Sequence, residues 1–264
     1  MFASTFLSYL LFATAALAAP RHGLNARIAR RAGARFSGPR LPVDGVNTLE
    51  HGNVSNVDYS SNWAGTFVVP TPKAPSGGGS GTYSASAWVG IDGDTCGSAI
   101  LQTGIDLTIS GGSVSFDAWY EYFPDVAHDF SNFEISAGEW NSCRELRLLT
   151  KSIKSGNTIT LTATATSATA GTVTIKNTVT KALTSTAKLC GENAEWIVED
   201  YEEGSSLVPF ANFGKVVFTK AQATTSSGTK VGPSGAAILD IRQNNKVLTS
   251  VTGATSNSVT IAYV

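Results

Sequence analysis

Apolar and polar residues alternate with a period of two over much of the chain between about residue 53 and residue 264. Short runs with this alternation, or rich in β-branched and aromatic residues, are bounded by Gly, Pro, Asn or Ser, as strands separated by turns are. The runs are AGTFVVP, YSASAWVGI, SVSFDAWYEYF, NTITLTATATS, GTVTIKNTV, NAEWIVEDYEE, KVVFTKA and SVTIAYV. The pattern predicts an all-β fold, a sandwich of two packed antiparallel sheets, with a barrel as the alternative.

The composition supports one sizeable β domain. Of the 264 residues, 42% are hydrophobic and only 15% are charged, a balance that favours an extracellular β domain over a helical cytosolic protein. The Ser/Gly-rich stretch at residues 74–84 predicts a long loop between strands, and gives no reason to divide the chain.

The first eighteen residues are apolar and end in Ala16-Leu17-Ala18, the small-residue pattern that signal peptidase accepts. We expect a signal peptide at residues 1–18 and a secreted protein without a membrane anchor. The alternative, an anchor, is disfavoured because the run is short and no other segment reaches about 20 apolar residues.

Residues 19–52 form a basic leader. They hold six arginines against two acids, a formal charge of +4, whereas residues 53–264 hold 13 Lys/Arg and 18 Asp/Glu, a charge of −5. With the dibasic pair Arg30-Arg31 and no periodicity, the leader is interpreted as a propeptide. A nucleic-acid-binding arm is the alternative, which a secretory signal disfavours.

Histidine and cysteine offer little chemistry. His51 borders the leader and His128 follows Pro124-Asp125 in a predicted turn, with no GxSxG or HExxH motif nearby, so we interpret His128 as a surface residue. Three scattered cysteines have no zinc-ligand spacing. We therefore expect neither a metal nor another cofactor.

Carboxylate, amide and tryptophan side chains, in contrast, share faces of several predicted strands. Residues two apart in a strand lie on the same face. The resulting sets are Glu195, Ile197, Glu199 and Tyr201; Asp117, Trp119 and Glu121; Trp88, Gly90 and Asp92; and Ile100, Gln102 and Gly104. An ordinary solvated face is the simplest interpretation, but acids beside large aromatics are more typical of a substrate groove.

Several stretches closely resemble the eqolisin family of fungal glutamic peptidases, in order from about residue 59 to residue 264. They are SSNWAG, AWVGIDGDTC, AILQTGID, DAWYEYFPD, AEWIVEDYEE and VPFANF. The resemblance implies a secreted, acid-acting endopeptidase built as a sandwich of two bent antiparallel sheets, concanavalin-like or jelly-roll-like. Residues 53–264 would then be the catalytic domain, acting on proteins or peptides.

The resemblance also implies roles for individual residues. The catalytic Gln is Gln102 of the LQTG motif, and the catalytic Glu is assigned to Glu199, the second Glu of the AEWIVE motif. A disulfide is implied between Cys96 and Cys190, which leaves Cys143 unpaired. The residues implied to contact substrate or support the groove are Trp88, Asp92, Asp117, Trp119 and Glu121.

Such a pair suits peptide hydrolysis in acid. A Glu side chain, with an ordinary pKa near ~4.3, can take a proton from the attacking water and return it to the leaving nitrogen. The Gln amide stays neutral and can donate a hydrogen bond to the developing oxyanion at any pH.

Residues 139–156, EWNSCRELRLLTKSIKSG, depart from the family pattern. They could be a genuine extension in which RELRLLTKS forms a short helix, or a retained intron. Codons for Gly138-Glu139-Trp140 can contain the splice donor GTGAGT, and removing the 18 codons restores ISAGNTITL in frame. We favour the intron; finding the segment in mature message would rule it out.

Other functions fit parts of the pattern. A carbohydrate-binding or glycoside-hydrolysing sandwich would also display acids and aromatics, but Gln102 stands where a glycosidase would want a second acid. We further expect a monomer that binds no nucleic acid, inhibition by its own propeptide, and glycosylation at Asn53 of the Asn53-Val54-Ser55 sequon.

Overall fold

The computed structural model describes residues 46–50, 62–130, 153–175, 179–203, 206–225 and 227–264. Several predictions concern residues outside these ranges: the signal peptide, residues 19–45 of the leader, Asn53, Cys143 and the helix at RELRLLTKS. The described residues form strands, turns and loops. None of their segments is a helix long and apolar enough to cross a membrane.

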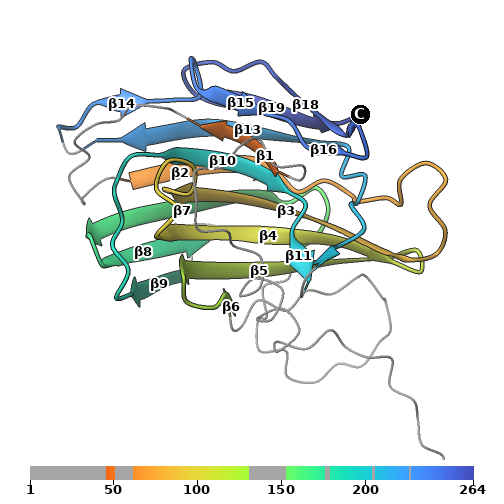
Figure 1. Ribbon diagram of the computed structural model, residues 1–264, viewed down its shortest axis with the longest axis horizontal. Helices are drawn as coiled ribbons and strands as arrows, with labels where there is room; N and C mark the ends of the chain where they lie inside the picture. Colours follow the sequence, from red (N-terminus) through yellow and green to blue (C-terminus); the bar gives the residue numbers. More distant parts are fainter. Residues whose placement is uncertain (1–45, 51–61, 131–152, 176–178, 204–205, 226) are drawn as a thin grey trace, which may run out of the picture.

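Two large antiparallel sheets pack face to face, which confirms the sandwich and not the barrel (Figure 1). In spatial order, the seven-stranded sheet contains β15 (Ala237–Leu239), β1 (Val46–Glu50), β10 (Ala194–Glu199), β3 (Thr82–Ile91), β4 (Ile100–Ser110), β5 (Ser113–Phe123) and β6 (His128–Asp129). The eight-stranded sheet contains β18 (Thr249–Thr252), β19 (Ser258–Tyr263), β13 (Lys215–Thr224), β2 (Asn62–Val68), β7 (Thr158–Ser167), β8 (Ala170–Ile175) and β9 (Val179–Thr184), and β14 (Lys230–Val231) pairs with β13.

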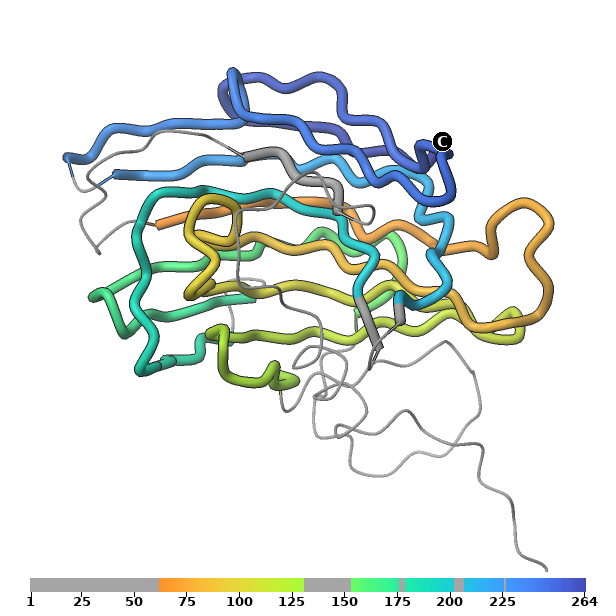
Figure 2. The backbone as a smooth tube through the Cα atoms, in the orientation of Figure 1, coloured from red at the N-terminus to blue at the C-terminus, as the bar shows by residue number. Residues whose placement is uncertain are grey.

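Two short hairpins complete the set of strands. They pair β11 (Glu202–Glu203) with β12 (Ser206–Leu207), and β16 (Arg242–Gln243) with β17 (Lys246–Val247). The loop between β2 and β3, which contains most of the predicted Ser/Gly stretch, projects from the side of the sandwich (Figure 2).

The inner faces of the two sheets enclose a core rich in aromatic residues, including Trp63, Trp196 and Phe218. The Trp196 indole donates to the carbonyl oxygen of Ala64 at 3.0 Å, so that its only N–H is satisfied across the two layers. A Cβ at Gly65 would lie 3.0–3.1 Å from Phe218, Trp196 and Val89. Any larger residue here would therefore push the facing side chains apart by a few tenths of an ångström, and glycine lets the two sheets approach this closely.

One strand extends the sandwich beyond its expected start at residue 53. Residues 46–50, placed in the leader by the sequence analysis, form β1 between β10 and β15. The folded part of the molecule thus includes a piece of the predicted propeptide.

The last four residues of the segment at 139–156 belong to the fold. Ile153 is buried in the core, and the backbone N–H of Gly156 donates to Val69 at 2.8 Å. These residues read IKSG before Asn157, the same I-x-x-G spacing as the ISAG that ends at Gly138. The rest of the segment lies outside the described residues.

Candidate active site

Strand parity sorts the side chains of the seven-stranded sheet as expected. On β10, Ala194, Trp196 and Val198 join the core between the sheets, whereas Ile197 belongs to a separate buried cluster on the opposite, outer face. Glu195 and Glu199 share that outer face with Ile197. The outer face of β10, β3, β4 and β5 therefore carries the predicted acids, the amide and two tryptophans.

Strand pairing arranges these outer-face residues in three cross-strand rows, each two residues further along the strands. The rows are Glu195, Gly90, Gln102 and Glu121; Ile197, Trp88, Gly104 and Trp119; and Glu199, Ser86, Asp106 and Asp117.

The first row changes the assignment of the catalytic Glu. Only Gly90 separates Gln102 from Glu195, so two strand spacings, about 10 Å, lie between their Cα atoms. Glu199 lies four residues further along β10, which adds about 13 Å along the strand and gives roughly 16 Å in all. A single water between two extended side chains can bridge the first distance but not the second. The register thus argues against Glu199, and for Glu195, as the partner of Gln102.

Gln102 and Glu121 are fully buried neighbours. The Gln102 amide nitrogen donates to a Glu121 carboxylate oxygen at 3.1 Å, which fixes the orientation of the amide. Its oxygen, Oε1, has no hydrogen-bond partner among the described residues. A buried amide with unused hydrogen-bonding capacity is unusual in a structural role and typical of a functional site.

The second row forms an apolar floor. Trp88, Trp119 and Ile197 make up the outer-face cluster, and the Trp88 indole donates to Glu199 at 3.0 Å. A Cβ at Gly104 would approach both Trp119 and Trp88 to 2.6 Å, so glycine is needed for the two indoles to lie this close. Glu199 therefore holds an indole of this floor.

The third row contains a hydrogen-bonded chain that sequence reasoning missed. The Trp119 indole donates to Ser86 at 3.2 Å, and Ser86 donates to Asp106 at 2.8 Å. Asp117 lies opposite Asp106 in the register. Extending the parity of the SAWVGI and LQTGID runs by one residue pair would have found both Ser86 and Asp106.

Strand parity predicted that Asp92 shares a face with Trp88 and Gly90, but Asp92 lies just beyond the end of the strand. β3 ends at Ile91, and Asp92 adopts a left-handed backbone with φ 63°. Its buried carboxylate accepts four backbone N–H groups, from Cys190, Gly191, Glu192 and Asn193, at 2.7–3.2 Å. Burial raises the pKa of Asp92, and the four N–H donors oppose that shift.

The implied disulfide is present beside this carboxylate. Cys96 and Cys190 are bonded, which links the loop after β3 to the segment that enters β10. Gly93 lies between Asp92 and this loop, and a Cβ there would come within 2.7 Å of Glu195. Asp92, the disulfide and Gly93 therefore set where β10 begins and leave room for Glu195.

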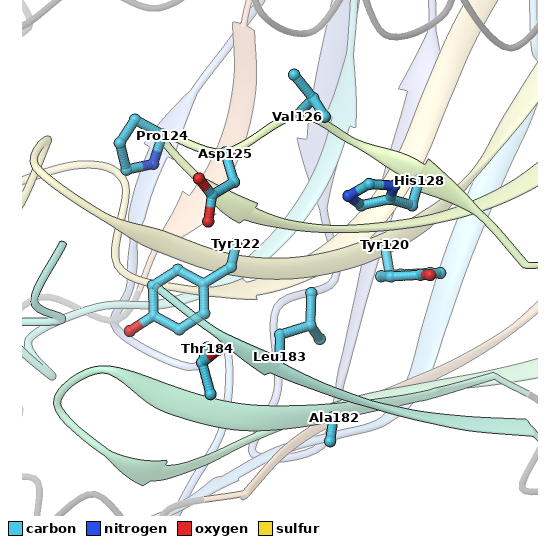
Figure 3. A pocket seen from close by; sticks show the side chains of 9 residues that line it. All are labelled: Tyr120, Tyr122, Pro124, Asp125, Val126, His128, Ala182, Leu183 and Thr184. Carbon is cyan, nitrogen blue, oxygen red and sulfur yellow. The ribbon is translucent and has the colours of Figure 1, made fainter. Parts of the chain in front are cut away.

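His128 lies away from these rows, in a cavity of about 550 Å³ at the β5, β6 and β9 edge (Figure 3). Its ring stacks on Tyr120 with centroids 5.5 Å apart, and Tyr120 lies on the face of β5 opposite Glu121. His128 is exposed, as expected. The described residues contain no group of three or more His, Cys, Asp and Glu that could hold a metal.

Known proteins match this chain over nearly its full length. The Peptidase A4 family model matches residues 51–144 and 146–263. Aspergillopepsin-2 of Aspergillus niger is 43% identical over 299 residues, covering 99% of each chain. Scytalidopepsin B of Scytalidium lignicola is 36% identical over 282 residues, covering 98% of this chain and 97% of its own.

The fold matches as well. A crystal structure of scytalido-glutamic peptidase with a transition state analog inhibitor superposes with a TM-score of 0.64 at 35% identity, covering 83% of this chain and 97% of its own. The sequence resemblance to the eqolisins is thereby confirmed: this chain belongs to the Peptidase A4 family and is a glutamic endopeptidase.

Proposed function

We propose that this peptidase is secreted and cleaves proteins in acid, with Glu195 activating a water and Gln102 stabilising the tetrahedral intermediate. One observation carries the assignment, namely the row in which Gly90 alone separates Gln102 from Glu195. Glycine contributes no side chain between the two, and the Trp88 ring fills the place where its Cβ would be, at 2.8 Å, so the Trp88 indole would flank a peptide carbonyl and a water held between Gln102 and Glu195.

Each side chain has a definite task in this mechanism. The Glu195 carboxylate takes a proton from the water as its oxygen attacks the peptide carbonyl, and later returns that proton to the leaving nitrogen. The Gln102 amide donates to the oxyanion as negative charge develops. Because an amide nitrogen carries two N–H groups, Gln102 can serve the oxyanion while it remains bonded to Glu121.

The neighbouring residues position this pair. Glu121 orients the Gln102 amide, and the floor of Trp88 and Trp119 excludes water below the scissile bond. Glu199 accepts a hydrogen bond from the Trp88 indole and thereby holds that indole in place. Asp117 is assigned to supporting contacts at the far end of the rows.

The leader regulates the enzyme in this proposal. All six of its arginines lie in residues 19–45, so near neutral pH they are attracted to the acids of the domain and cover the site. As carboxylates are protonated in acid the attraction weakens, and self-cleavage removes the arginine-rich part. The signal peptide directs export, and the mature protein is a monomer.

Hydrolysis of a denatured protein at about pH 2 to 4 in the presence of pepstatin tests the activity. We expect cleavage, with Gln102→Ala reducing kcat/KM by about 10²-fold or more because the oxyanion donor is lost. Gln222→Ala, which removes a half-buried amide from β13 in the eight-stranded sheet, is a matched control and should retain activity. Full activity of Gln102→Ala would refute the mechanism.

Neither the family match nor the site geometry favours the carbohydrate alternative. The first row offers one amide between carboxylates, and an amide cannot act as the second acid or base of a glycosidase. Binding to polysaccharide without proteolysis would reverse this preference.

A further inference from the structure

Asn193 lies directly before β10, two residues ahead of Glu195, and its buried side chain holds the loop that follows β3. Its amide oxygen, Oδ1, accepts hydrogen bonds from the backbone N–H of Thr95 at 3.0 Å and from the Thr95 hydroxyl at 3.1 Å. The backbone N–H of Cys96 also points to this oxygen, at 3.5 Å. One buried atom of Asn193 thus fixes two consecutive residues of the loop.

The backbone of Asn193 is attached to the other end of the same loop. Its carbonyl oxygen accepts from the N–H of Asp92 at 3.0 Å, and its own N–H donates to the Asp92 carboxylate at 3.2 Å. Within the loop, the N–H of Gly93 donates to the carbonyl oxygen of Cys96 at 3.1 Å. Residues 92–96 therefore form a closed turn, and both ends of this 92–96 turn are held by Asn193.

The 92–96 turn lies against the carboxylate of Glu195. A Cβ on Gly93 would come within 2.7 Å of Glu195 Oε1 and 2.9 Å of Oε2. Because a Cβ lies about 1.5 Å from its Cα, the Gly93 Cα is within about 4.5 Å of both oxygens. Glu195 is itself only 2% exposed. The Gly93 backbone therefore bounds the space in which the Glu195 carboxylate can turn.

We propose that Asn193 is a positioning residue for peptide hydrolysis: by holding the 92–96 turn, it keeps Gly93 against Glu195 and fixes the direction of the Glu195 carboxylate. A general base must point an oxygen at the attacking water, and a small displacement of that oxygen lowers the rate of the chemical step. Substrate binding, which depends on other contacts, would change little. The proposal rests on the proposed function, in which Glu195 is the base.

Separate measurement of kcat and KM on an oligopeptide in acid tests this role. Asn193→Ala removes Oδ1, and we expect kcat to fall by about tenfold or more while KM stays within about twofold. Asn193→Asp keeps an oxygen acceptor at this position, and should retain at least about a third of kcat.

Asn212→Ala is the matched control for lost hydrogen bonding. Asn212 lies in the loop between β12 and β13, and its Oδ1 accepts the N–H of Gly214 at 2.9 Å. Its removal should lower the Tm but leave kcat within about twofold. All variants are assayed below the lowest Tm, so that only folded protein contributes to the rate.

A second variant keeps the test decisive where Asn193→Ala does not fold. Thr95 is exposed, and Thr95→Ala removes only the hydroxyl that donates to Asn193 and to Glu192. We expect kcat to fall by about threefold with KM unchanged, because the 92–96 turn is then held less firmly.

Three outcomes would overturn the positioning role: an unchanged kcat in both Asn193→Ala and Thr95→Ala, an equal loss of kcat in Asn212→Ala, or an equal loss in Asn193→Asp. Glu195→Gln in the same assay separates this proposal from the proposed function. If Glu195→Gln is inactive and Asn193→Ala keeps its kcat, only the role of Asn193 fails. If Glu195→Gln stays active, the proposed base itself is wrong.

Discussion

The outer faces of the two sheets look alike in sequence but differ in the folded protein. On β7 of the eight-stranded sheet, buried residues alternate with partly or fully exposed threonines. On β4 of the seven-stranded sheet, the first eight residues are buried on both faces, including Gln102 and Asp106. One outer face is therefore solvated and the other is packed.

This difference shows how a functional face can be distinguished from an ordinary one. Thr66 and Thr160 hydrogen-bond to each other at 2.9 Å on the outer face of the eight-stranded sheet, where Thr66 is buried and Thr160 is half-buried, so each hydroxyl has a partner. Burying an amide or a carboxylate costs free energy unless each polar atom is bonded. The buried Gln102 retains part of that cost, because its Oε1 has no hydrogen-bond partner among the described residues, and the proposed role of Gln102 in the chemistry accounts for it.

The largest expected effect is a loss of activity on substitution of Glu195, in contrast to Glu199 at the other end of the same strand. Glu195→Gln removes the proposed base and should lower kcat/KM about 10³-fold or more. Glu199→Gln, on the same face of the same strand, keeps an oxygen that accepts the Trp88 indole and should cost less than about tenfold. Initial rates on a denatured protein in acid measure both. The reverse order would restore Glu199 as the base.

Asp92 should matter most for stability. Asp92→Ala leaves four backbone N–H groups without their acceptor, and we expect a loss of about 3 kcal/mol in the free energy of unfolding. Asp94→Ala, two residues away and partly exposed, should change it by less than about 0.5 kcal/mol. Denaturant titration gives both values, and equal effects would contradict the role of Asp92.

The raised pKa of Asp92 gives this effect a pH dependence. Its titration contributes stability that is fully present below the unfolded pKa of about 3.9, and that is lost as the pH rises through the higher folded pKa. The difference in unfolding free energy between the natural protein and Asp92→Asn should therefore be larger in acid than at neutral pH. A difference that grows with pH would mean that the four N–H donors outweigh burial.

Adding one methyl group to the packed face should be costly. Gly104→Ala would bring a Cβ within 2.6 Å of Trp88 and Trp119, whereas Gly97→Ala meets nothing within 4 Å. We expect the first to destabilise by about 1–3 kcal/mol and the second to have little effect. Thermal unfolding of both variants would show whether the outer face is as tightly packed as a core.

Deleting residues 139–156 should have a small effect on the fold. The deletion removes Ile153 and Gly156 but brings ISAG, ending at Gly138, to the position of IKSG before Asn157. Because Ile135 then takes the place of Ile153 in the core, we expect the Tm to change by no more than a few degrees. Failure of the deleted chain to fold would mark the segment as a genuine part of the protein.

The smallest effect should come from the solvated face. Thr162→Val on β7 keeps a β-branched side chain at a half-buried position, and should change the free energy of unfolding by less than about 0.5 kcal/mol and leave kcat/KM unaltered. A large loss of activity would mean that the two outer faces do not differ in function.

The sequence predicted strands and faces well because alternation is a local property of the chain. It put Glu195 and Ile197 on one face of a strand, and in β10 they share the face opposite the core between the sheets. Parity did not distinguish Glu195 from Glu199, and the family resemblance led to the assignment of Glu199, whereas we propose Glu195. The choice depends on how β10 aligns with β3, which is set by pairing between distant segments. The parity of Asp92 failed for a different reason: the strand ends one residue earlier, at Ile91.

The bond between Cys96 and Cys190 also determines how this peptidase tolerates damage. It spans 94 residues, so the strands from β4 to β9 all lie within the covalent loop that it closes. A single backbone cut anywhere in that loop leaves one covalent molecule whose strands keep their partners. Because copies of an endopeptidase can cut one another, a single cut between residues 97 and 189 would leave the two fragments covalently joined, and only reduction of the disulfide would let them separate.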